Sequence, residues 1–517
     1  MCGITYQPIN TYVSNTINYR GPDNTQNLET KRGIFSFHRL SINDSSILGN
    51  QPFSFNHITY VCNGEIYNWE ELKQEYAIDN YKSNSDCEII GHLYNLVDIE
   101  ILCQKLDGVF AFVMETQDSI IAARDPIGIR PLFVSEKNNA FSSEAKELLD
   151  LGYTDVIPFP PNTYFKNGVF IEYRGIIYDC PSLVYNENTL VDLLTKAVKK
   201  RLMSDNPVAC LLSGGLDSSI IAALAQKCSN YNINTFSIGM FKDAPDLCYA
   251  RTVAQYIGST HHEIIYSEEE GLEALNEVIY HLESYDCTTV RASIPMFLLS
   301  KYISQNTDFK VILSGEGADE LFGGYIYFHN APNYETFQEE TVRLVKDVYK
   351  YDVLRGDRAT AGNGLEIRVP FFDKTFAQYI LNIDPKLKHP NGGIEKHILR
   401  KAFSEELPTS VIFRQKDAFS DAVGYSWKNC LKSFAEKNLS TAMLDECHKF
   451  GVSTISDEEA YYKQVYYKYF KEWNQLDYMW RPKWTDILDP SATFLKLHNT
   501  QTISTFRQCP NVSQPRL

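Results

Sequence analysis

A short stretch of the chain combines hydroxyl groups, glycines and a carboxylate in a pattern suited to phosphate chemistry. Residues 208–212 form an apolar run, residues 216–224 carry apolar side chains at helical spacing, and Ser213, Gly214 and Gly215 join the two. We expect a strand, a tight turn and a helix in that order. Backbone N–H groups in a glycine turn can close around an anion, and the positive end of the helix points at the same place. The pattern therefore predicts an anion site.

The same turn contains an acid. Asp217 follows the glycines, whereas the lysine of a Walker A loop is absent. An acidic side chain beside phosphates indicates a bridging cation, for which Mg²⁺ is the usual choice. The alternative is that Ser-Gly-Gly only ends a strand and caps a helix. The longer sequence from Ser213 to Ser218 resembles the pyrophosphate-binding loop of enzymes that cleave ATP between its α and β phosphates.

A second glycine-rich acidic turn, Ser314-Gly315-Glu316-Gly317-Ala318-Asp319, follows residues 309–313, which read as another strand. Strands of a parallel sheet present their carboxyl ends at one edge, so we expect the two turns side by side. Asp217 and Asp319 would then bind Mg²⁺, and Glu316 would contact the reacting carboxyl group or the nucleotide. A glycine-rich loop with solvated acids is the alternative.

Cys2 is a candidate nucleophile of a different kind. Removal of Met1 would leave Cys2 as the first residue, with a thiol and an α-amino group on one residue. Because an α-amino group titrates near ~7.7–8.0, this amine could accept the thiol proton without a histidine. A cysteine at position 2 carries little weight alone, so the case depends on other residues.

Those residues occur at three later points. Arg39 stands at an expected strand end and offers a fork suited to a carboxylate. Asn63 and Gly64 follow the apolar run 58–62, where amide donors could face an oxyanion. Asp86 precedes a helical pattern and could hold an ammonium. The alternatives are a surface ion pair for Arg39, a hairpin turn at Asn63 and Gly64, and a helix N-cap at Asp86.

Composition narrows the class of protein. The 517 residues allow two or three domains, and a formal charge of −16 with a pI near 5.2 argues against a nucleic-acid surface. Neither a run of about 18 apolar residues nor a secretory signal is present, so we expect no membrane partner and a cytoplasmic location. The 12 cysteines show no zinc spacing and are expected to be free thiols.

The pattern of elements changes along the chain. Short alternating runs up to about residue 175 are compatible with antiparallel sheets. Residues 174–187 lose this period and read as a linker. A helix is expected over residues 189–203, and strands over 234–240 and 309–313. Strands alternating with helices predict an α/β domain with a parallel, doubly wound sheet and many helices.

The N-terminal motifs together resemble the glutaminase domain of class II glutamine amidotransferases. They are Cys2-Gly3-Ile4, Tyr19-Arg20-Gly21-Pro22-Asp23, His38-Arg39-Leu40, Asn63-Gly64-Glu65-Ile66-Tyr67-Asn68, Ser85-Asp86 and Arg124-Asp125-Pro126-Ile127-Gly128-Ile129-Arg130-Pro131-Leu132. The resemblance implies an α+β sandwich of two antiparallel sheets with outer helices. It also implies Cys2 as nucleophile and Asn63 with Gly64 as the oxyanion hole. Glutamine would be bound by Arg39, Leu40, Ser41, Ile42, Asn43, Asn63, Gly64, Glu65 and Asp86.

The sequence departs from this family at two points. The interval between Gly3 and the Arg-Gly-Pro-Asp motif is shorter than usual, so we expect a helix there to be trimmed. Tyr19 also replaces a common histidine. Neither change touches Cys2, although either could alter closure of the glutamine loop.

The C-terminal motifs resemble the glutamine-hydrolysing asparagine synthetases. They are Glu283-Ser284-Tyr285-Asp286, Arg291-Ala292-Ser293-Ile294-Pro295-Met296, the run 314–325, Gly364-Leu365-Glu366-Ile367-Arg368-Val369-Pro370-Phe371-Phe372-Asp373, Arg414-Gln415-Lys416 and Gly424-Tyr425-Ser426-Trp427. The resemblance covers Cys2 to about Ser491. We expect a glutaminase domain over residues 2–175, a synthetase domain over 188–491 and a loose tail over 492–517.

This resemblance implies a reaction and a set of roles. The β-carboxylate of L-aspartate would attack the α-phosphorus of MgATP, and ammonia from L-glutamine would displace AMP from β-aspartyl-AMP. Glu316 would support the intermediate, and Lys416 would neutralise phosphate charge as pyrophosphate leaves, although a surface lysine is the alternative. ATP would be bound by Leu211, Ser213, Gly214, Gly215, Asp217, Ser218, Ile238, Ser314 and Gly315. Because ammonium is no nucleophile, we also expect an apolar passage for ammonia between the domains.

Other functions stay open at this point. An amidotransferase that adenylates and amidates a different carboxylate is the nearest alternative. A β-lactam-forming relative is disfavoured by Cys2, a glutamine-sensing scaffold by intact motifs at both sites, and a tRNA-modifying enzyme by the acidic charge. A homodimer is neither favoured nor excluded.

Overall fold

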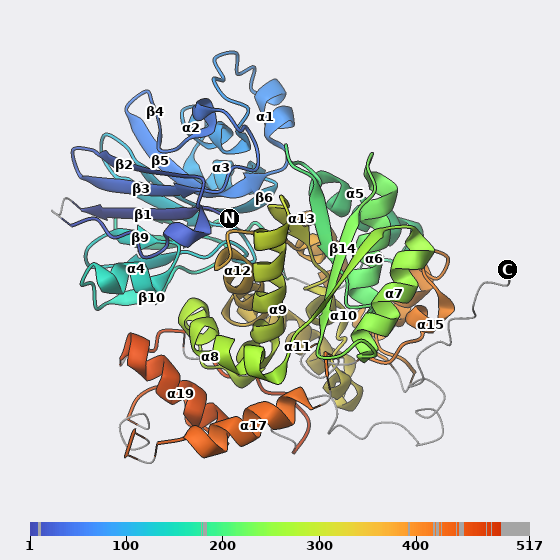
Figure 1. Ribbon diagram of the computed structural model, residues 1–517. Helices are drawn as coiled ribbons and strands as arrows, with labels where there is room; N and C mark the ends of the chain where they lie inside the picture. The colour runs from blue at the N-terminus through green and yellow to red at the C-terminus, as the bar shows by residue number, and fades with distance from the viewer. Residues whose placement is uncertain are drawn as a thin grey trace.

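The computed structural model describes most of the chain, in two units that share one interface (Figure 1). The described residues are 1–8, 12–176, 178, 183–390, 393–416, 419, 423–424, 426–440, 442–443, 449–471, 473–476 and 478–486. The expected tail, 492–517, lies outside them, as do parts of the expected linker.

The first unit, here called the N-terminal sandwich, contains two six-stranded sheets. Every strand pairing in them is antiparallel, which confirms the expected sandwich. The first sheet has the order β10(Val156–Pro158), β8(Phe133–Ser135), β9(Ala140–Ser142), β1(Gly3–Pro8), β3(Gly33–Arg39), β2(Asn24–Glu29). The second has the order β12(Val169–Glu172), β11(Thr163–Lys166), β7(Ile120–Arg124), β6(Gly108–Glu115), β5(Ile58–Ile66), β4(Phe53–Phe55).

Alternating apolar side chains hold the two sheets together. Ile4 and Tyr6 of β1 and Phe37 of β3 share a buried cluster with Val61 of β5 and Val113 of β6. The opposite face of the second sheet is covered by α1(Trp69–Glu75), α2(Ile89–Tyr94) and α3(Ile99–Lys105), which form a separate apolar cluster on it. Helix α4(Ala145–Asp150) packs beside β8, β9 and β10. Between β1 and η1(Asn18–Arg20), the described residues 12–17 contain no helix, as the short interval predicted.

The second unit, here called the C-terminal unit, is built on a parallel five-stranded sheet. Its order is β15(Thr260–Ile265), β14(Asn234–Gly239), β13(Val208–Leu211), β16(Val311–Leu313), β17(Glu366–Arg368). The chain first builds outward from β13 to β15 and then returns to place β16 on the other side of β13. Ligands bind at such a reversal of strand order in open α/β sheets, beyond the carboxyl ends of the strands. The fold therefore places the turns after β13 and β16 at the expected binding edge.

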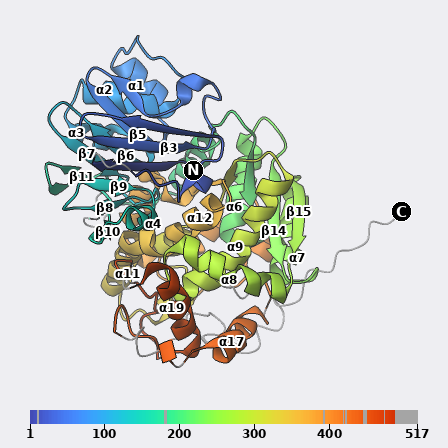
Figure 2. The same cartoon turned by 60° about the vertical axis from the view of Figure 1, so that its left-hand side comes forward.

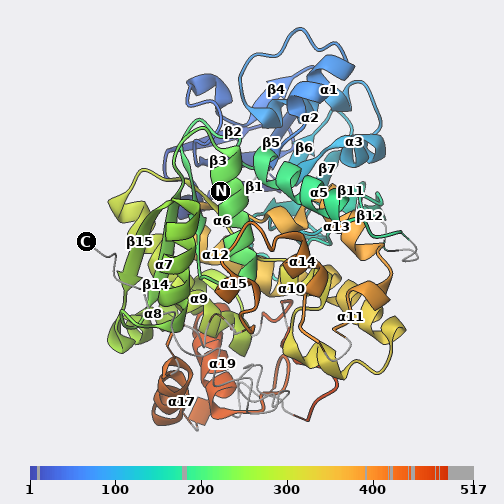
Figure 3. The same cartoon turned by 90° about the vertical axis from the view of Figure 1, so that its right-hand side faces the viewer.

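Helices surround this sheet, as the alternation of elements predicted. Helices α6 and α7 lie side by side near β14 (Figure 3). Helix α6 contacts β13, α9 contacts β14 and α12 contacts β17. Helix α5 matches the helix expected over 189–203. The helices are α5(Glu187–Lys200), α6(Leu216–Cys228), α7(Pro245–Ile257), α8(Glu268–Leu282), α9(Cys287–Asn306), α10(Ala318–Phe322), α11(Tyr334–Asp347), α12(Asp352–Ala361), α13(Lys374–Leu381), α14(His397–Ala402), α15(Thr409–Ile412), α17(Trp427–Asn438) and α19(Asp457–Phe470).

None of the described helices is long and apolar enough to cross a membrane. The cysteines among the described residues are all free thiols, as expected.

Candidate active sites

Cys2 lies directly before β1, against the residue that follows β3. The thiol donates to the carbonyl of Leu40, with Sγ and O 3.8 Å apart, and the Leu40 N–H donates to Sγ at 3.5 Å. Arg20 donates from Nε to the Cys2 carbonyl at 3.1 Å. The pairing of β1 with β3 brings Cys2 and Leu40 together, because Gly3 stands opposite His38. The fold thus fixes the backbone on both sides of the candidate nucleophile.

Burial changes the pKa values of the Cys2 thiol and of the neighbouring Met1 amine. It raises the pKa of the Cys2 thiol to about 11, against the opposing effect of the neighbouring amine. Burial also lowers the pKa of the Met1 α-amino group to about 6. An amine in these surroundings is therefore mostly neutral at pH 7 and able to accept a proton. The thiol needs such a base, since few thiolates would form unaided.

Asn63 has the properties of an oxyanion donor, but its place in the fold differs from the one expected. Strand β5 does not end before Asn63 and Gly64; it continues to Ile66, so both the strand-end prediction and the hairpin alternative are wrong. The Asn63 amide is buried and has no hydrogen-bond partner among the described residues. A side chain at Gly64 would collide with the Val109 carbonyl of β6, which explains a glycine inside a strand.

Three of the predicted glutamine-binding residues form one cluster. The amide of Asn43 donates to Glu65 at 2.6 Å and to Asp86 at 3.3 Å. Asp86 also accepts from the Ile66 N–H at 2.6 Å, so it does not cap a helix; Ser85 precedes η3(Asp86–Glu88) instead. Burial raises the pKa of Asp86 to about 6 and the pKa of Glu65 well above its usual range. A ligand ammonium would favour the ionised forms of both acids.

Arg39 performs a structural task in this site. It is buried, and its guanidinium donates to the carbonyls of Asp44 and Ser46 and to the side chain of Asn50, the Ser46 contact at 2.8 Å. The alternative of a surface ion pair is therefore wrong. Arg39 holds the loop that carries Asn43. The other predicted residues, Leu40, Ser41 and Ile42, link β3 to that loop.

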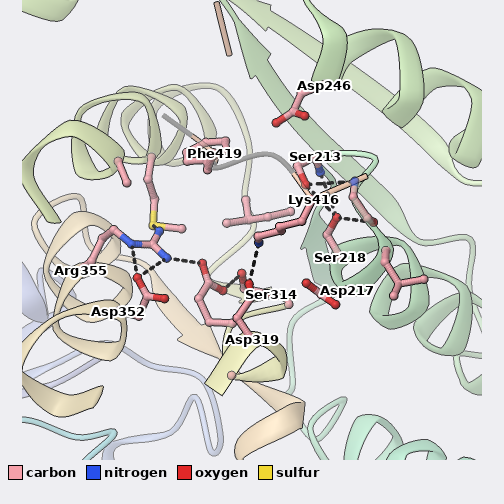
Figure 4. A pocket seen from close by; sticks show the side chains of 18 of the residues that line it. Ser213, Asp217, Ser218, Asp246, Ser314, Asp319, Asp352, Arg355, Lys416 and Phe419 are labelled. Carbon is pink, nitrogen blue, oxygen red and sulfur yellow. Dashed lines mark hydrogen bonds and ion pairs between the residues drawn. The ribbon is translucent and has the colours of Figure 1, made fainter. Parts of the chain in front are cut away.

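The second site is a cavity of about 230 Å³ at the reversal point of the parallel sheet. Both acidic turns reach it, so Asp217 and Asp319 lie at one site as predicted (Figure 4). The predicted residues that line it are Leu211, Ser213, Gly215, Asp217, Ser218, Ile238, Ser314, Gly315, Glu316, Asp319 and Lys416. Gly214 does not line the cavity. Its φ of +70° and its close approach to Ala250 of α7 show that it shapes the turn instead.

The turn after β13 has free backbone donors where an anion would sit. Helix α6 begins after Gly215, and no side chain among the described residues caps its first N–H groups. Ser213 and Ser218 bond each other through their hydroxyls at 3.0 Å and keep the turn closed. A side chain at Gly315 would collide with the Ser218 N–H, so the two turns approach as closely as glycine allows. This geometry suits a phosphate group.

Two lysines compensate the acids of the cavity. Lys396 lies between Asp217 and Asp319, with Nζ 2.6 Å from an oxygen of each, and Lys416 pairs with Asp319 at 2.6 Å. Although burial opposes ionisation, the two ammonium groups hold the pKa of Asp319 well below its usual range. Burial raises the pKa of Glu316, which bonds Ser314 and pairs with Arg355 at 3.3 Å.

The two aspartates fit a magnesium ion that arrives with phosphates. Oδ1 of Asp217 is buried without a hydrogen-bond partner among the described residues. No group of three or more His, Cys, Asp or Glu side chains in the described part of the chain could hold a metal by itself. Mg²⁺ usually takes one or two carboxylates from the protein and its other ligands from phosphates and water. Asp217 and Asp319 supply that number.

Sequence reasoning assigned no role to several residues at these sites. Arg368 of β17 pairs with Glu65 at 3.1 Å, and Arg130 pairs with Glu366 of β17 at 2.8 Å. Arg20 pairs with Asp357 of α12 at 2.8 Å. These charged residues lie inside or near the motifs that carry the family resemblance. Each of them pairs with a residue that is far away in the sequence. Lys396 stands in no recognised motif.

These pairs bear on the expected passage for ammonia. The described contacts next to Cys2 that cross from the sandwich to the C-terminal unit include the buried ion pairs of Arg20, Arg130 and Glu65. The interface beside the nucleophile therefore contains these charged pairs together with apolar side chains, since Met1, Leu40 and Ile42 belong to the same buried cluster as β13. The passage itself stays a prediction.

Both parts of the chain match known protein families. The asparagine synthase family profile matches residues 189–337 and 329–493, and the glutamine amidotransferase domain profile matches residues 1–169. The glutamine-hydrolysing asparagine synthetase of Rattus norvegicus is 42% identical over 535 residues, covering 93% of this chain and 94% of that protein. The Homo sapiens protein of the same name is 41% identical with the same coverage. A solved glutamine phosphoribosylpyrophosphate amidotransferase from B. subtilis matches distantly, with a TM-score of 0.30, 16% identity, and coverage of 51% of this chain and 81% of that chain.

Proposed function

The chain belongs to the family of glutamine-hydrolysing asparagine synthetases, and we propose that its two sites carry out the two halves of that reaction. It is a ligase that makes L-asparagine from L-aspartate with ATP, using nitrogen from L-glutamine. The proposed division is a glutaminase domain over residues 2–175 and a synthetase domain over 188–491. The observation that carries the synthetase half is that two acidic glycine turns line one cavity.

Glutamine hydrolysis is assigned to Cys2. After removal of Met1, the free amine takes the thiol proton, and Sγ attacks the side-chain amide carbon of glutamine. Asn63 and Gly64 donate to the oxyanion that forms, because the unpaired Asn63 amide is available for it. Ammonia leaves with the proton from the amine, and water then releases glutamate from the thioester. Asn43, Glu65 and Asp86 bind the α-amino end of glutamine, while Arg39 holds their loop.

Activation of aspartate is assigned to the cavity at β13 and β16. An oxygen of the β-carboxylate attacks the α-phosphorus of ATP, and the bond to the bridging oxygen of the β-phosphate breaks. The free N–H groups at the start of α6 hold the departing pyrophosphate. Ammonia then attacks the acyl carbon of β-aspartyl-AMP, loses a proton and displaces AMP.

The charged side chains of the cavity have separate roles in this half. Mg²⁺, held by Asp217 and Asp319, would neutralise phosphate charge. Lys416 stabilises the charge of the leaving pyrophosphate. Glu316 orients the reacting groups, and Arg355 fixes its carboxylate.

A panel of carboxylic acids tests the proposal and its nearest alternative. Incubation with MgATP, glutamine and one acid at a time should give AMP, pyrophosphate and an amide with L-aspartate. The same products with another acid, and none with aspartate, would show an amidotransferase for a different carboxylate. Cytoplasmic location and the absence of nucleic-acid partners stay predictions from sequence, and the sequence leaves the oligomeric state open.

A further inference from the structure

Lys396 occupies the position where a cation would bridge the two acidic turns. Its Nζ lies 2.6 Å from Oδ2 of Asp217 and 2.6 Å from Oδ1 of Asp319. The Lys396 side chain is 2% exposed, whereas those of Asp217 and Asp319 are 15% and 13% exposed. The ammonium therefore lies beneath the carboxylates, on the protein side of the cavity.

The fold is built to hold this ammonium. Lys396 adopts a left-handed backbone conformation, with φ of +56°, directly before α14. A non-glycine residue keeps that conformation only where its surroundings require it. A side chain at position 324 would collide with the Cε of Lys396 and with Oδ1 of Asp319, so Gly324 leaves the space that the lysine fills. Two separate features of the chain thus place Nζ between the aspartates.

The charges explain what the lysine does for the cavity. With Lys396 and Lys416 present, the two carboxylates face two ammonium groups. Lys416 forms a close ion pair with Asp319, and the charges of Lys416 and Arg400 also act on Asp217 from farther away. Among the described residues, Lys396 forms the close ion pair with Asp217. Without Lys396, two neighbouring carboxylates would repel each other, and an external cation would relieve that repulsion.

We propose that Lys396 is an internal counter-ion that makes binding of a divalent cation between Asp217 and Asp319 conditional on a bound polyphosphate. The inference rests on the proposed function of this cavity. A bare cation would have to displace an ammonium that then has no partner. A cation that arrives bound to a polyphosphate is accompanied by the negative charges of the phosphates. The displaced ammonium of Lys396 can pair with those phosphate charges. The metal therefore enters as its nucleotide complex, and free Mg²⁺ does not compete for the aspartates.

Metal binding without catalysis tests this directly. Mn²⁺ serves as the probe, since its free concentration can be followed by electron paramagnetic resonance in the nucleotide-free full-length protein. Wild type should bind Mn²⁺ weakly alone and tightly with the unreactive α,β-methylene-ATP. Lys396→Met should bind Mn²⁺ alone about tenfold or more tightly than wild type, because the competing ion pairs are gone.

Two control variants separate the bridging position from simple charge. Lys416→Met removes the same charge from the same cavity but leaves Lys396 between the aspartates, so its gain in Mn²⁺ affinity should be clearly smaller. Lys401→Met removes a largely exposed lysine and should change nothing. Equal gains in Lys396→Met and Lys416→Met would mean that net charge governs the site, and the proposal would be wrong. Tight binding of Mn²⁺ alone by wild type would also overturn it.

Thermal unfolding provides a second readout that also reports folding. In the presence of a chelator, the melting temperature of Lys396→Met should be lower than that of wild type. In buffer without the chelator, Mn²⁺ alone should restore the melting temperature of the variant. Wild type should gain stability only with Mn²⁺ and the nucleotide analogue together. If Lys396→Met does not fold, Lys396→Gln keeps the length of the side chain and removes its charge. Lack of Mn²⁺ stabilisation in both variants would contradict the proposal, whether or not aspartate proves to be the substrate.

Discussion

The chemistry of Cys2 depends on its surroundings more than on the thiol itself. Burial raises the pKa of the thiol to about 11, so a base is needed, and no histidine makes a described hydrogen bond to Sγ. The α-amino group created by removal of Met1 is the base that the mechanism requires.

Replacing the thiol should separate the two reactions. Cys2→Ala should lower glutamine-dependent asparagine formation by about a thousand-fold or more, because no other nucleophile can form the thioester. Synthesis with ammonium salts should stay close to the wild-type rate, since the cavity at β13 and β16 is untouched. Both rates are measured from AMP release. An equal loss of both would contradict separate sites.

The amine should set the acid limb of glutamine hydrolysis. Its base form is required, so activity is present above its pKa and is lost as pH falls through that value. Burial lowers the pKa of the Met1 amine, and we expect the Cys2 amine exposed by removal of Met1 to have a lowered pKa for the same reason. The value of kcat/KM should therefore fall about tenfold per pH unit below that pKa, at a pH below the ~7.7–8.0 of an ordinary α-amino group. Glutamate release between pH 5 and 9 gives the profile. A limb near pH 8 would indicate a solvated amine, and intact mass shows whether Met1 is absent.

Residue types and spacing predicted part of each site. The turn at Ser213 and the acids Asp217 and Asp319 could be found because glycines, a strand and a helix stand next to one another in the sequence. Lys396 could not be found, since nothing near it in the sequence suggests that its partners lie 179 and 77 positions away. Its position becomes visible only when β13 and β16 are adjacent.

Elements were predictable where their hydrophobic pattern was strong. Strands β13, β14 and β16 and helices α5 and α6 were expected from apolar runs and helical spacing. The two edge strands of the parallel sheet were not. Strand β15 contains Thr-His-His-Glu before its apolar end, and the three residues of β17 begin and end with charges that pair inside the protein. Sequence patterns favour central strands because edge strands need not be apolar.

Helix α12 lies between the sandwich and the rest of the C-terminal unit (Figure 2), and its side chains contact residues of both sites. Arg355, near its start, pairs with Glu316 in the cavity at 3.3 Å. Asp357, two residues later, accepts from Arg20 at 2.8 and 3.1 Å, and Arg20 in turn donates to the Cys2 carbonyl. A shift of α12 would therefore move contacts of both Cys2 and Glu316.

Neutralising Asp357 should weaken this connection and the interface. Asp357→Asn leaves the buried guanidinium of Arg20 with Glu144 as its remaining acidic partner, which should cost about 3 kcal/mol of unfolding free energy. Urea unfolding measures the cost, and the ratio of glutamate to asparagine produced should rise as coupling is lost. Glu75→Gln breaks an exposed pair with Lys105 and should leave the free energy of unfolding almost unchanged. Equal effects of the two variants would contradict the role of Asp357.

At the scale of the whole molecule, the two units form one continuous body. Met1, Leu40 and Ile42 of the sandwich belong to the same buried apolar cluster as the central strand β13. The ion pairs beside Cys2 lie in this interface and are almost fully buried. These contacts shield the side of Cys2 that faces the C-terminal unit, although Cys2 itself is half-buried, and they favour the predicted passage of ammonia inside the protein.

Isotope competition tests that passage. With glutamine labelled by ¹⁵N in its amide and an excess of unlabelled ammonium in the buffer, asparagine should carry mainly ¹⁵N, because ammonia released at Cys2 does not mix with solvent. Mass spectrometry of the product gives the ratio. Cys2→Ala should give only unlabelled asparagine under the same conditions and so measures the contribution of bulk ammonia. If the label in the wild-type product were diluted in proportion to the added ammonium, ammonia would be travelling through solvent, and the continuous interface would have no part in transfer.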